Sequence, residues 1–454
     1  MKSCAPGKEQ IEKDFSLIDE LGANAIRFSH YQHPQYAYDL ADHMGFVAWA
    51  EIPMLAMEDG NEKLIENAEE QLKELILQNL HHPSICFWGL QNEIGMRGES
   101  LSTYANMKKL EAAAKRLDPS RFTACAEVFS VPNHSELNFI HDAVGYNLYY
   151  GWYTGEFSDY IPIAEKFHKD NPDVPLAVTE YGADCNLQYH TSAPERQDYT
   201  EEYQAVFHES VYQYLEKIPF LWGTFVWNMF DFSSAVRDEG GIPQRNMKGL
   251  VTYDRNIKKD SYYFYRASWS KTPFVHLCGC RYMHRHEKTT SIKVYSNEPE
   301  VTLFVDGKEY QTIKGNRIFV FEGIPMQKSM LVEAVGHSQK IHDEMILKYV
   351  EEDDPLYIYP KKQSGNVANW FAENIGKGSL SIEGHYSVND RIMDLLSNQE
   401  AAQVLEAYLP QIIYDERTKM FGGMTLLRVI DRSHAELSQE QLVELNHQLH
   451  KISK

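Results

Sequence analysis

Two glutamates follow short apolar runs that are typical of buried strands. Glu93 comes shortly after Ile85–Leu90, and Glu180 comes shortly after Val174–Val178. In a fold of parallel strands in a barrel, the carboxyl ends of the strands meet at one face, so we expect both side chains to enter one cleft. Two carboxyl groups about 5–5.5 Å apart can cleave an acetal with retention, because one protonates the leaving group while the ionised one stabilises the positive reaction centre. The pair therefore predicts a glycoside-cleaving site.

The residues next to these glutamates favour a catalytic role over a structural one. The structural alternative is that each glutamate merely ends its strand and pairs with a nearby arginine or lysine, as most glutamates do. Asn92 precedes Glu93, and its amide can hydrogen-bond a sugar hydroxyl beside the reacting carbon. Tyr181 follows Glu180, and a tyrosine hydroxyl can orient a nucleophilic carboxylate and keep it ionised. We therefore expect chemistry at both glutamates.

From residue 8 to about residue 270, helical stretches alternate with short runs rich in valine, isoleucine, phenylalanine and tryptophan. This alternation is typical of repeated βα units around a parallel sheet. Amphipathic helices are predicted over Lys63–Asn79, Tyr104–Arg116 and Glu201–Lys217. The predicted strands are Asn24–Ser29, Phe46–Glu51, Ile85–Gln91, Phe122–Ala126, Ala143–Tyr149, Leu176–Glu180 and Leu221–Trp227.

Polar or reactive residues follow several of these strands, which favours a (β/α)8 barrel. Glu93 and Asn147 are two examples. In such a barrel the active site lies at the carboxyl ends of the strands. A doubly wound sheet would place its chemistry at one switch point, and no GxGxxG loop follows any predicted strand. The fold class is therefore predicted as α/β, a (β/α)8 TIM barrel.

The barrel is predicted to lack its first strand, because the sequence opens into a helix, Glu9–Asp19, that should follow one. After Pro273 the pattern changes to short alternating runs with hairpin turns, which predict a small β-sandwich of immunoglobulin type. Glu351–Pro355 is an acidic break typical of a linker, and helical periodicity follows it. The predicted units are the barrel (1–271), the sandwich (272–350), a linker (351–365) and a mainly helical C-terminal region (366–454).

Composition excludes several functional classes. The 454 residues include 44 lysines and arginines against 65 aspartates and glutamates, a net charge of −21, so no nucleic-acid partner is expected. No apolar run reaches the roughly 20 residues of a membrane helix, and the N-terminus shows no signal-peptide core, so we expect a cytoplasmic protein without a membrane partner. The six cysteines lack CxxC spacing, and Cys278 and Cys280 are too close together for a metal knuckle, so reduced structural thiols are expected.

Longer motifs carry a specific resemblance. Asn24–Pro34, followed by Tyr38–Asp42 and Gly45, resembles one signature of glycoside hydrolase family 2, the group that contains β-galactosidases and β-glucuronidases. Asn79–Glu93 resembles the second signature, which surrounds the acid/base residue. Both motifs are long and ordered, so together they are highly specific. The resemblance covers residues 8–350 and, more loosely, the C-terminal region.

This resemblance implies roles for individual residues. Glu93 would be the general acid/base, and Glu180 the nucleophile that forms a glycosyl-enzyme intermediate. Tyr149 matches the family tyrosine beside the nucleophile. Single residues keep structural alternatives, such as an ion-pair role for Arg27 or a core role for Trp227. The other residues expected in the sugar site are Arg27, His30, Asn92, Asn147, Trp227, Asn228 and Lys248.

The substrate is predicted from two motifs that disagree. Asn246-Met247-Lys248 resembles the Asn-x-Lys motif with which β-glucuronidases bind the sugar carboxylate, and Lys248 can pair with a uronate. The surrounding segments, Phe225–Phe232 and Lys248–Arg255, look closer to bacterial β-galactosidases. We therefore expect a retaining exo-acting β-galactosidase that hydrolyses terminal β-D-galactosides, with β-glucuronidase as the alternative.

Family members normally carry a jelly-roll and an immunoglobulin-like domain before the barrel, and neither is seen in this sequence. We therefore expect a fragment, an alternative start or one half of a complemented enzyme, with a homo-oligomer or a missing N-terminal segment as its protein partner. The rival interpretation is a truncated, non-catalytic carbohydrate-binding protein. No cofactor is expected and no metal either, because His81 and His82 lack a carboxylate at zinc spacing and Ala50–Leu55 lacks the family's magnesium pattern.

Overall fold

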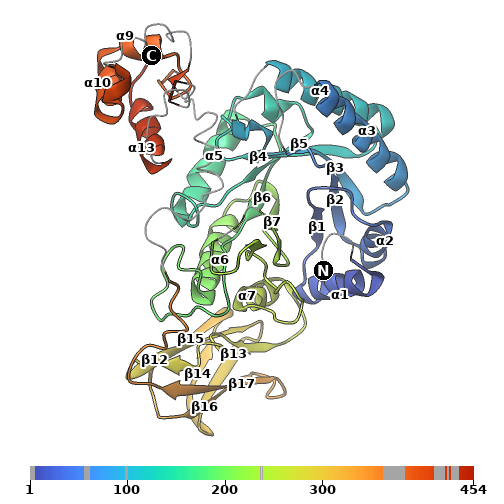
Figure 1. Ribbon diagram of the computed structural model, residues 1–454. Helices are drawn as coiled ribbons and strands as arrows, with labels where there is room; N and C mark the ends of the chain where they lie inside the picture. Colours follow the sequence, from blue (N-terminus) through green and yellow to red (C-terminus); the bar gives the residue numbers. More distant parts are fainter. Residues whose placement is uncertain are drawn as a thin grey trace.

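Strands and helices alternate in the predicted order (Figure 1). The computed structural model describes residues 6–55, 62–97, 101–235, 237, 239–360, 384–413, 425–426, 429–430 and 439–454. The first part is a curled sheet of 7 parallel strands in the order β1-β2-β3-β4-β5-β6-β7. Every strand end lies within two residues of its prediction, which confirms the fold class. The strands are β1 (Ala25–Phe28), β2 (Val47–Glu51), β3 (Ile85–Asn92), β4 (Phe122–Val128), β5 (Ala143–Asn147), β6 (Leu176–Tyr181) and β7 (Leu221–Val226).

Amphipathic helices cover the outer face of the sheet (Figure 1). In the first of them, Ile11 and Phe15 lie one turn apart and are both buried. That helix ends at Gly22, whose φ of 84° is a left-handed conformation that glycine adopts without steric cost. The helices are α1 (Lys8–Leu21), α2 (Gln35–Met44), α3 (Glu62–Asn79), α4 (Leu101–Leu117), α5 (Tyr160–Asp170), α6 (Glu201–Leu215) and α7 (Asp260–Trp269).

Aromatic side chains join the two ends of the sheet across the inside of the curl. Trp49 of β2, Phe87 of β3 and Trp222 of β7 pack in stacked or tilted pairs, with ring centroids 4.7, 6.0 and 6.1 Å apart. Because β7 is the last strand of the sheet and β2 and β3 are near its start, these contacts require the sheet to close on itself. The described strands therefore form a nearly closed barrel.

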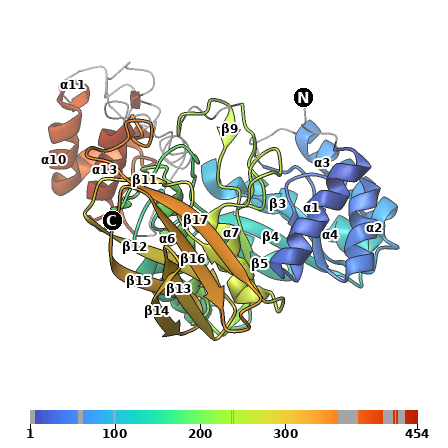
Figure 2. The ribbon, with the colours of Figure 1, turned by 90° about the horizontal axis from the view of Figure 1, so that it is seen from below.

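A β-sandwich follows the barrel, with α7 lying between the two in both views (Figure 1, Figure 2). One sheet has the order β10-β12-β15 and the other β11-β17-β16-β13-β14. Apolar side chains such as Ile292, Val332 and Leu347 are fully buried between them. The strands are β10 (Val275–Leu277), β11 (His284–Arg285), β12 (Thr289–Ser296), β13 (Glu300–Val305), β14 (Lys308–Lys314), β15 (Arg317–Pro325), β16 (Met330–Gly336) and β17 (His342–Tyr349).

Short helices at the C-terminus pack around a core of their own, which includes Leu405 and Leu445. They are α9 (Ile392–Ser397), α10 (Gln399–Tyr408), α11 (Pro410–Ile413) and α13 (Gln439–Leu449). Of the predicted linker, residues 351–360 are described and 361–365 lie outside the described residues. Among the helices that the structure describes, none combines the length and the apolar character needed to cross a membrane.

Candidate active site

The predicted site residues gather at the carboxyl ends of the barrel strands. A strand end is the natural place for them, because the last side chains of parallel strands share one face of the barrel. Hydrogen bonds, ion pairs and ring contacts then link most of these side chains to one another. By element they are Arg27 on β1, His30 after it, Asn92 and Glu93 at the end of β3, Asn147 and Tyr149 at the end of β5, Glu180 on β6, and Trp227 and Asn228 after β7.

Glu180 is a buried carboxylate held by two donors. The Arg27 guanidinium donates to Oε1 at 2.8 Å, and the Tyr149 hydroxyl donates to Oε2 at 2.7 Å. The Nε2 atom of His30 lies 3.8 Å from Oε1. Because each oxygen faces a fixed donor, the carboxylate has a defined orientation and its charge faces a guanidinium.

The side chain of Glu93 has an amide as its partner rather than a cation. Asn147 donates from Nδ2 to Oε1 of Glu93 at 2.9 Å. The φ of Glu93 is 55°, a left-handed value that non-glycine residues adopt where the surrounding structure imposes it, often at active sites. Burial, together with the negative charge of Glu180, raises the pKa of Glu93 to about 8. At neutral pH Glu93 therefore carries a proton that it can donate.

Arg27 connects several strands through its guanidinium. It donates to both carboxylate oxygens of Glu51 on β2, at 2.9 and 3.1 Å, and to Oδ1 of Asn92 on β3 at 2.8 Å, in addition to Glu180 on β6. Glu51 also lies 2.7 Å from Nδ1 of His30. Burial alone would raise the pKa of Glu51, but Arg27 and His30 outweigh it and lower this pKa. Arg27 thus ties the strand that carries Glu180 to the strands at the start of the barrel.

A flat aromatic surface lies beside Glu180. The partly buried Trp227 ring stacks on His30 with centroids 5.0 Å apart, and an indole ring suits the apolar face of a pyranose. Asn228 follows, and its backbone N–H donates to the Lys248 carbonyl at 3.2 Å. Gly182 lies so close that a Cβ there would be 1.9 Å from the Trp227 carbonyl oxygen, so only glycine fits. The segments that carry Glu180 and Trp227 are therefore in backbone contact.

Lys248 is a buried cation beside these residues, with 1% of its side chain exposed. Its Nζ donates to the Tyr153 hydroxyl at 2.7 Å, forms an ion pair with Asp184, and lies 6.0 Å from the centre of the Tyr149 ring. Asn246 positions it, because the Asn246 side chain accepts the backbone N–H of Lys248 at 3.1 Å. The Asn-x-Lys motif is therefore a turn that holds a buried cation near the Tyr149 ring, paired with Asp184.

Sequence reasoning missed two carboxylates and misplaced one tyrosine. Glu51 ends β2, just as Glu93 follows β3 and Glu180 lies near the end of β6, so its strand-end position was the available signal. Asp184 lies in the loop after β6, where no pattern marks it. The prediction for Tyr181 is wrong: its hydroxyl meets that of Tyr265 at 3.3 Å, because neighbouring residues on a strand point to opposite faces.

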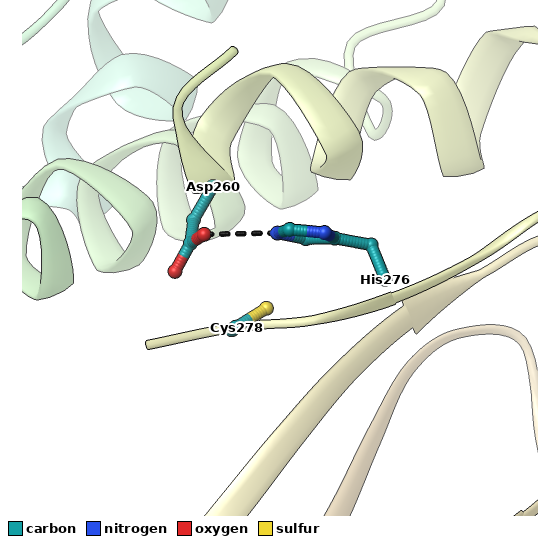
Figure 3. Close-up of side chains that lie close together, drawn as sticks. All are labelled: Asp260, His276 and Cys278. Carbon is teal, nitrogen blue, oxygen red and sulfur yellow. Dashed lines mark hydrogen bonds and ion pairs between the residues drawn. The ribbon is translucent and has the colours of Figure 1, made fainter. Parts of the chain in front are cut away.

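A second buried cluster, Asp260, His276 and Cys278, lies where α7 meets the sandwich (Figure 3). Its potential ligand atoms lie within 4.8 Å of one another, and residues of these types can bind zinc. Asp260, however, already hydrogen-bonds His276 at 2.9 Å, accepts the Gly279 N–H at 2.7 Å and faces the Arg281 guanidinium at 3.2 Å. A divalent cation would have to displace these donors beside an arginine, so the cluster fits an ion-pair network rather than a metal centre.

Known proteins resemble this chain over the barrel and beyond. Residues 4–273 match the model of glycosyl hydrolases family 2, TIM barrel domain. A β-glucuronidase of Bacteroides fragilis is 36% identical over 367 residues, which are 76% of this chain and 51% of that protein. The crystal structure of an FMN-binding β-glucuronidase from Facaelibacterium prausnitzii L2-6 is 42% identical, with a TM-score of 0.75, and the match covers 78% of this chain and 54% of that one.

A further similar structure is β-glucuronidase 2 of Bacteroides uniformis, covalently bound to cyclophellitol-6-carboxylate aziridine. It is 32% identical with a TM-score of 0.71, and the match covers 76% of this chain and 44% of that one. The chain spans about half the length of the curated relatives that it matches. Since the family model matches more than half of the 454 residues, the chain belongs to glycoside hydrolase family 2.

Proposed function

We propose that this chain carries the active site of a retaining β-glucuronidase. The observation that carries the proposal is the position of Lys248, whose ammonium is buried 6.0 Å from the ring of Tyr149. Tyr149 in turn hydrogen-bonds Glu180, so a positive charge lies next to the proposed nucleophile. An ammonium there suits the carboxylate of a uronic acid, whereas the neutral hydroxymethyl group of a galactoside offers it no matching charge.

The relatives support a uronate in the same way. The Bacteroides fragilis and Facaelibacterium prausnitzii relatives are both β-glucuronidases. The Bacteroides uniformis β-glucuronidase holds a covalently bound ligand that carries a 6-carboxylate. Our expectation of a galactoside rested on the segments around Lys248, and these relatives favour the glucuronide alternative instead.

In the proposed first step, the Glu180 carboxylate attacks the anomeric carbon of the sugar. Glu93 gives its proton to the glycosidic oxygen as the bond between this oxygen and the anomeric carbon breaks, and the aglycone leaves as an alcohol. The raised pKa of Glu93 keeps this proton available at neutral pH. Arg27 and Tyr149 hold Glu180 in its attacking orientation.

In the proposed second step, water replaces the enzyme at the anomeric carbon. Once Glu180 is esterified to the sugar it no longer carries a charge, so the contribution of that charge to the raised pKa of Glu93 disappears. The pKa of Glu93 then falls, and the residue becomes a base. Glu93 takes a proton from water, the resulting oxygen attacks the anomeric carbon, and Glu180 is released as a carboxylate.

Covalent labelling tests the proposal without requiring turnover. The full chain is incubated with a cyclophellitol-6-carboxylate aziridine of glucuronic configuration and, separately, with the galacto-configured aziridine that lacks the carboxylate. We expect one adduct per chain from the carboxylate probe, located by peptide mass spectrometry at Glu180 and absent from Glu180→Gln. Labelling of equal or greater rate by the galacto-configured probe would contradict the glucuronide assignment.

A matched pair of lysine variants tests the role of Lys248. Lys248→Met removes the cation beside Tyr149, whereas Lys259→Met removes an equally buried cation that pairs with Asp231 at 2.9 Å. We expect Lys248→Met to slow labelling by the carboxylate probe roughly 10- to 100-fold, the effect of losing one charge-assisted hydrogen bond. Lys259→Met should preserve the preference between the two probes. Equal losses of preference in both variants would mean that the effect is structural.

A further inference from the structure

Strand β3 contains one residue more than its neighbour β4 just before the proposed acid/base residue. Gly89 pairs with Ala124 and Gln91 pairs with Cys125, so Leu90 has no partner on β4. Such an extra residue is a β-bulge, which interrupts the regular alternation of side chains along a strand and re-aims the residues that follow it. The bulge therefore decides which of the next side chains enters the barrel.

After the bulge, Asn92 points into the barrel and Gln91 points away from it. Asn92 accepts a hydrogen bond from Arg27 in the active site at 2.8 Å. Gln91 instead donates from Nε2 to Oε1 of Glu127 on β4 at 2.6 Å, and both residues are buried. Ala124 packs with the aromatic cluster inside the barrel, and Glu127 is three positions further along β4, so it faces the opposite side. The Gln91–Glu127 pair therefore lies behind the site, on the side of the sheet that the helices cover.

The other end of the Gln91 amide holds the backbone that follows Glu93. Its Oε1 accepts the backbone N–H of Ile94 at 3.3 Å. Ile94 begins a short 3-10 helix, Ile94–Arg97, and the first N–H groups of a helix have no partner within it. Glu93 itself donates its backbone N–H to the Ala126 carbonyl of β4 at 2.7 Å. The backbone is thus tied to its surroundings both at Glu93, whose φ is 55°, and directly after it.

The turn after Glu93 also covers Glu127 directly. A Cβ on Gly95, within this turn, would lie 2.5 Å from a Val131 methyl group and 3.9 Å from Oε2 of Glu127. Because only a hydrogen fits there, the turn packs tightly over the end of β4. Glu127 therefore meets the segment that carries Glu93 twice, through the Gln91 amide and at the glycine that follows.

The two carboxyl groups of the site are oriented in different ways. The oxygens of Glu180 meet two donors, Arg27 and Tyr149. The side chain of Glu93 is bonded to the Asn147 amide through one of its oxygens. A single bond fixes one oxygen but not the direction of the whole side chain, so the aim of Glu93 depends more strongly on its backbone.

We propose that Gln91 and Glu127 are positioning residues for the acid/base: Glu127 fixes the Gln91 amide, and Gln91 holds the turn that directs the Glu93 carboxyl group toward the glycosidic oxygen. Neither residue touches the sugar, because the pair lies behind the strands. The inference rests on the proposed role of Glu93 as proton donor, but not on the identity of the sugar. The alternative is a purely structural pair, which would stabilise β3 against β4 without a particular effect on proton donation.

A comparison of leaving groups tests the proposal, because a general acid matters most when the leaving group is poor. Gln91→Met keeps the length of the side chain and removes both of its hydrogen bonds. We expect kcat/KM for phenyl β-glucuronide to fall roughly 10- to 100-fold, a part of the roughly 10²–10⁴-fold that a general acid contributes. The value for dinitrophenyl β-glucuronide, whose leaving group needs little protonation, should fall less than about threefold. Losses of equal size on the two substrates would overturn the proposal.

The control carries the same substitution at another buried glutamine. Gln204 on α6 donates to the Ala183 carbonyl at 2.9 Å and accepts the Ser261 hydroxyl at 2.9 Å, so Gln204→Met also removes buried hydrogen bonds. It should change the rates with both leaving groups by the same factor. The corresponding aryl β-galactosides are measured alongside, and a preference for them would contradict the glucuronide assignment while the comparison of leaving groups stays valid. If circular dichroism shows that Gln91→Met does not fold, Gln91→Asn, whose amide is one methylene shorter, replaces it with the same expectation.

A titration of Glu93 tests the same positioning without turnover. Burial and the charge of Glu180 raise the pKa of Glu93 to about 8, and both effects depend on where the side chain lies. In protein labelled with carbon-13 at the glutamate carboxyl groups, the NMR signal of Glu93 is identified by its absence from Glu93→Gln. In Gln91→Met its midpoint should fall from about 8 toward the ordinary value of 4.5, whereas Gln204→Met should leave it in place. An unchanged midpoint in Gln91→Met would overturn the positioning role, whereas absence of turnover on every glycoside would count against the proposed function alone.

Glu127 is tested as the partner of Gln91. Glu127→Met should reproduce the selective loss on phenyl β-glucuronide, whereas Glu127→Gln keeps an oxygen that can accept the Gln91 amide and should retain most of the activity. Because the two residues act in series, the double variant Gln91→Met/Glu127→Met should lose no more than Gln91→Met alone. Losses that multiply in the double variant, or a selective loss in Glu127→Gln as large as that in Glu127→Met, would show that the pair does not act as a unit and would contradict the proposal.

Discussion

Two buried networks of charged side chains differ in how their charges are matched. Where the barrel meets the sandwich, Asp260 contacts both His276 and Arg281, and Arg281 also pairs with Glu201. His276 reaches a second carboxylate, Asp343, at 3.4 Å. Each carboxylate of this interface network therefore has a cationic partner, and the network joins two structural layers.

In the active-site network, not every carboxyl group has a cationic partner. Glu51 and Glu180 both pair with Arg27 and both lie near His30, whereas Glu93 is bonded to the amide of Asn147. The consequences for the carboxyl groups are opposite. Burial would raise the pKa of Asp260, but His276 and Arg281 outweigh it and lower that pKa. For Glu93, burial and the charge of Glu180 act together, and its pKa rises to about 8. Of these two buried carboxyl groups, the one bonded to an amide therefore has the raised pKa, and the one paired with cations has the lowered pKa.

The sharpest way to separate the networks is to neutralise one carboxylate in each. Glu180→Gln should lower hydrolysis of an activated aryl β-glucuronide roughly 10⁴-fold or more, as expected for loss of a nucleophile, while the melting temperature changes little. Asp260→Asn should do the reverse, lowering the melting temperature while the folded fraction keeps its activity. A large loss of stability in Glu180→Gln would contradict the claim that the two networks have separate roles in activity and stability.

Removing the cation of the interface network should cost the most stability. Arg281→Met leaves Glu201 and Asp260 buried without it, and breaking a buried ion pair in this way typically costs about 3–5 kcal/mol. The control is Arg317→Met, whose partner Glu216 is 37% exposed, and its effect should stay below about 1 kcal/mol. Urea unfolding followed by tryptophan fluorescence measures both. Similar midpoints for the two variants would show that the interface network does not hold the layers together.

The pH dependence of activity should report Glu93. Because the proposed mechanism needs a protonated Glu93 in the free protein, kcat/KM should fall as the pH rises through about 8. The hydrogen bond from Asn147 lowers the pKa of Glu93, so Asn147→Ala should move this basic limb to higher pH. Initial rates from pH 5 to 10 on an aryl β-glucuronide give both profiles. A basic limb that stays in place in Asn147→Ala would remove Glu93 from the role of acid.

The smallest expected effect is the pH dependence of the interface network. Burial lowers the pKa of His276, but hydrogen bonds and charges from Asp260 and Asp343 outweigh it and raise the pKa. The stabilisation is therefore complete below the unfolded value of about 6.5 and is lost as the pH rises through the higher folded pKa. The two aspartates, whose pKa values are lowered, contribute in full above about pH 4, and this contribution is lost as the pH falls through their folded pKa values. The melting-temperature difference between wild type and His276→Gln should accordingly shrink from pH 6 to pH 9, and a constant difference would contradict this account.

The barrel could be predicted because its strands are short, mainly apolar runs and its helices are amphipathic, and these two patterns alternate along the sequence. Sandwich strand β14 (Lys308–Lys314) escaped prediction, because nearly all of its side chains are exposed and no alternation marks it. Glu93 and Glu180 were found because side chains at the carboxyl ends of barrel strands share one face. The same rule applied to Glu51 would have found the partner of Arg27 and His30.

The sequence did not favour the substrate that we propose, because the contact that supports it joins distant segments. Lys248 belongs to a turn after the last barrel strand, and Tyr149 follows β5. Only the fold brings the ammonium to the ring and shows that Tyr149 also bonds Glu180. The expectation of a galactoside came instead from the residues next to Lys248 in the sequence, which resemble those of bacterial β-galactosidases.

Arg27, which orients Glu180, stands on the shortest strand of the barrel. β1 has 4 residues, and within the described residues its only strand neighbour is β2. A short edge strand of this kind opens locally at a lower free energy than the whole fold unfolds. Each such opening would release the guanidinium from the carboxylate while the other strands stay in place. Activity should therefore be lost at a lower temperature than the one at which the protein melts. Between these two temperatures, circular dichroism should show a folded protein that has no activity.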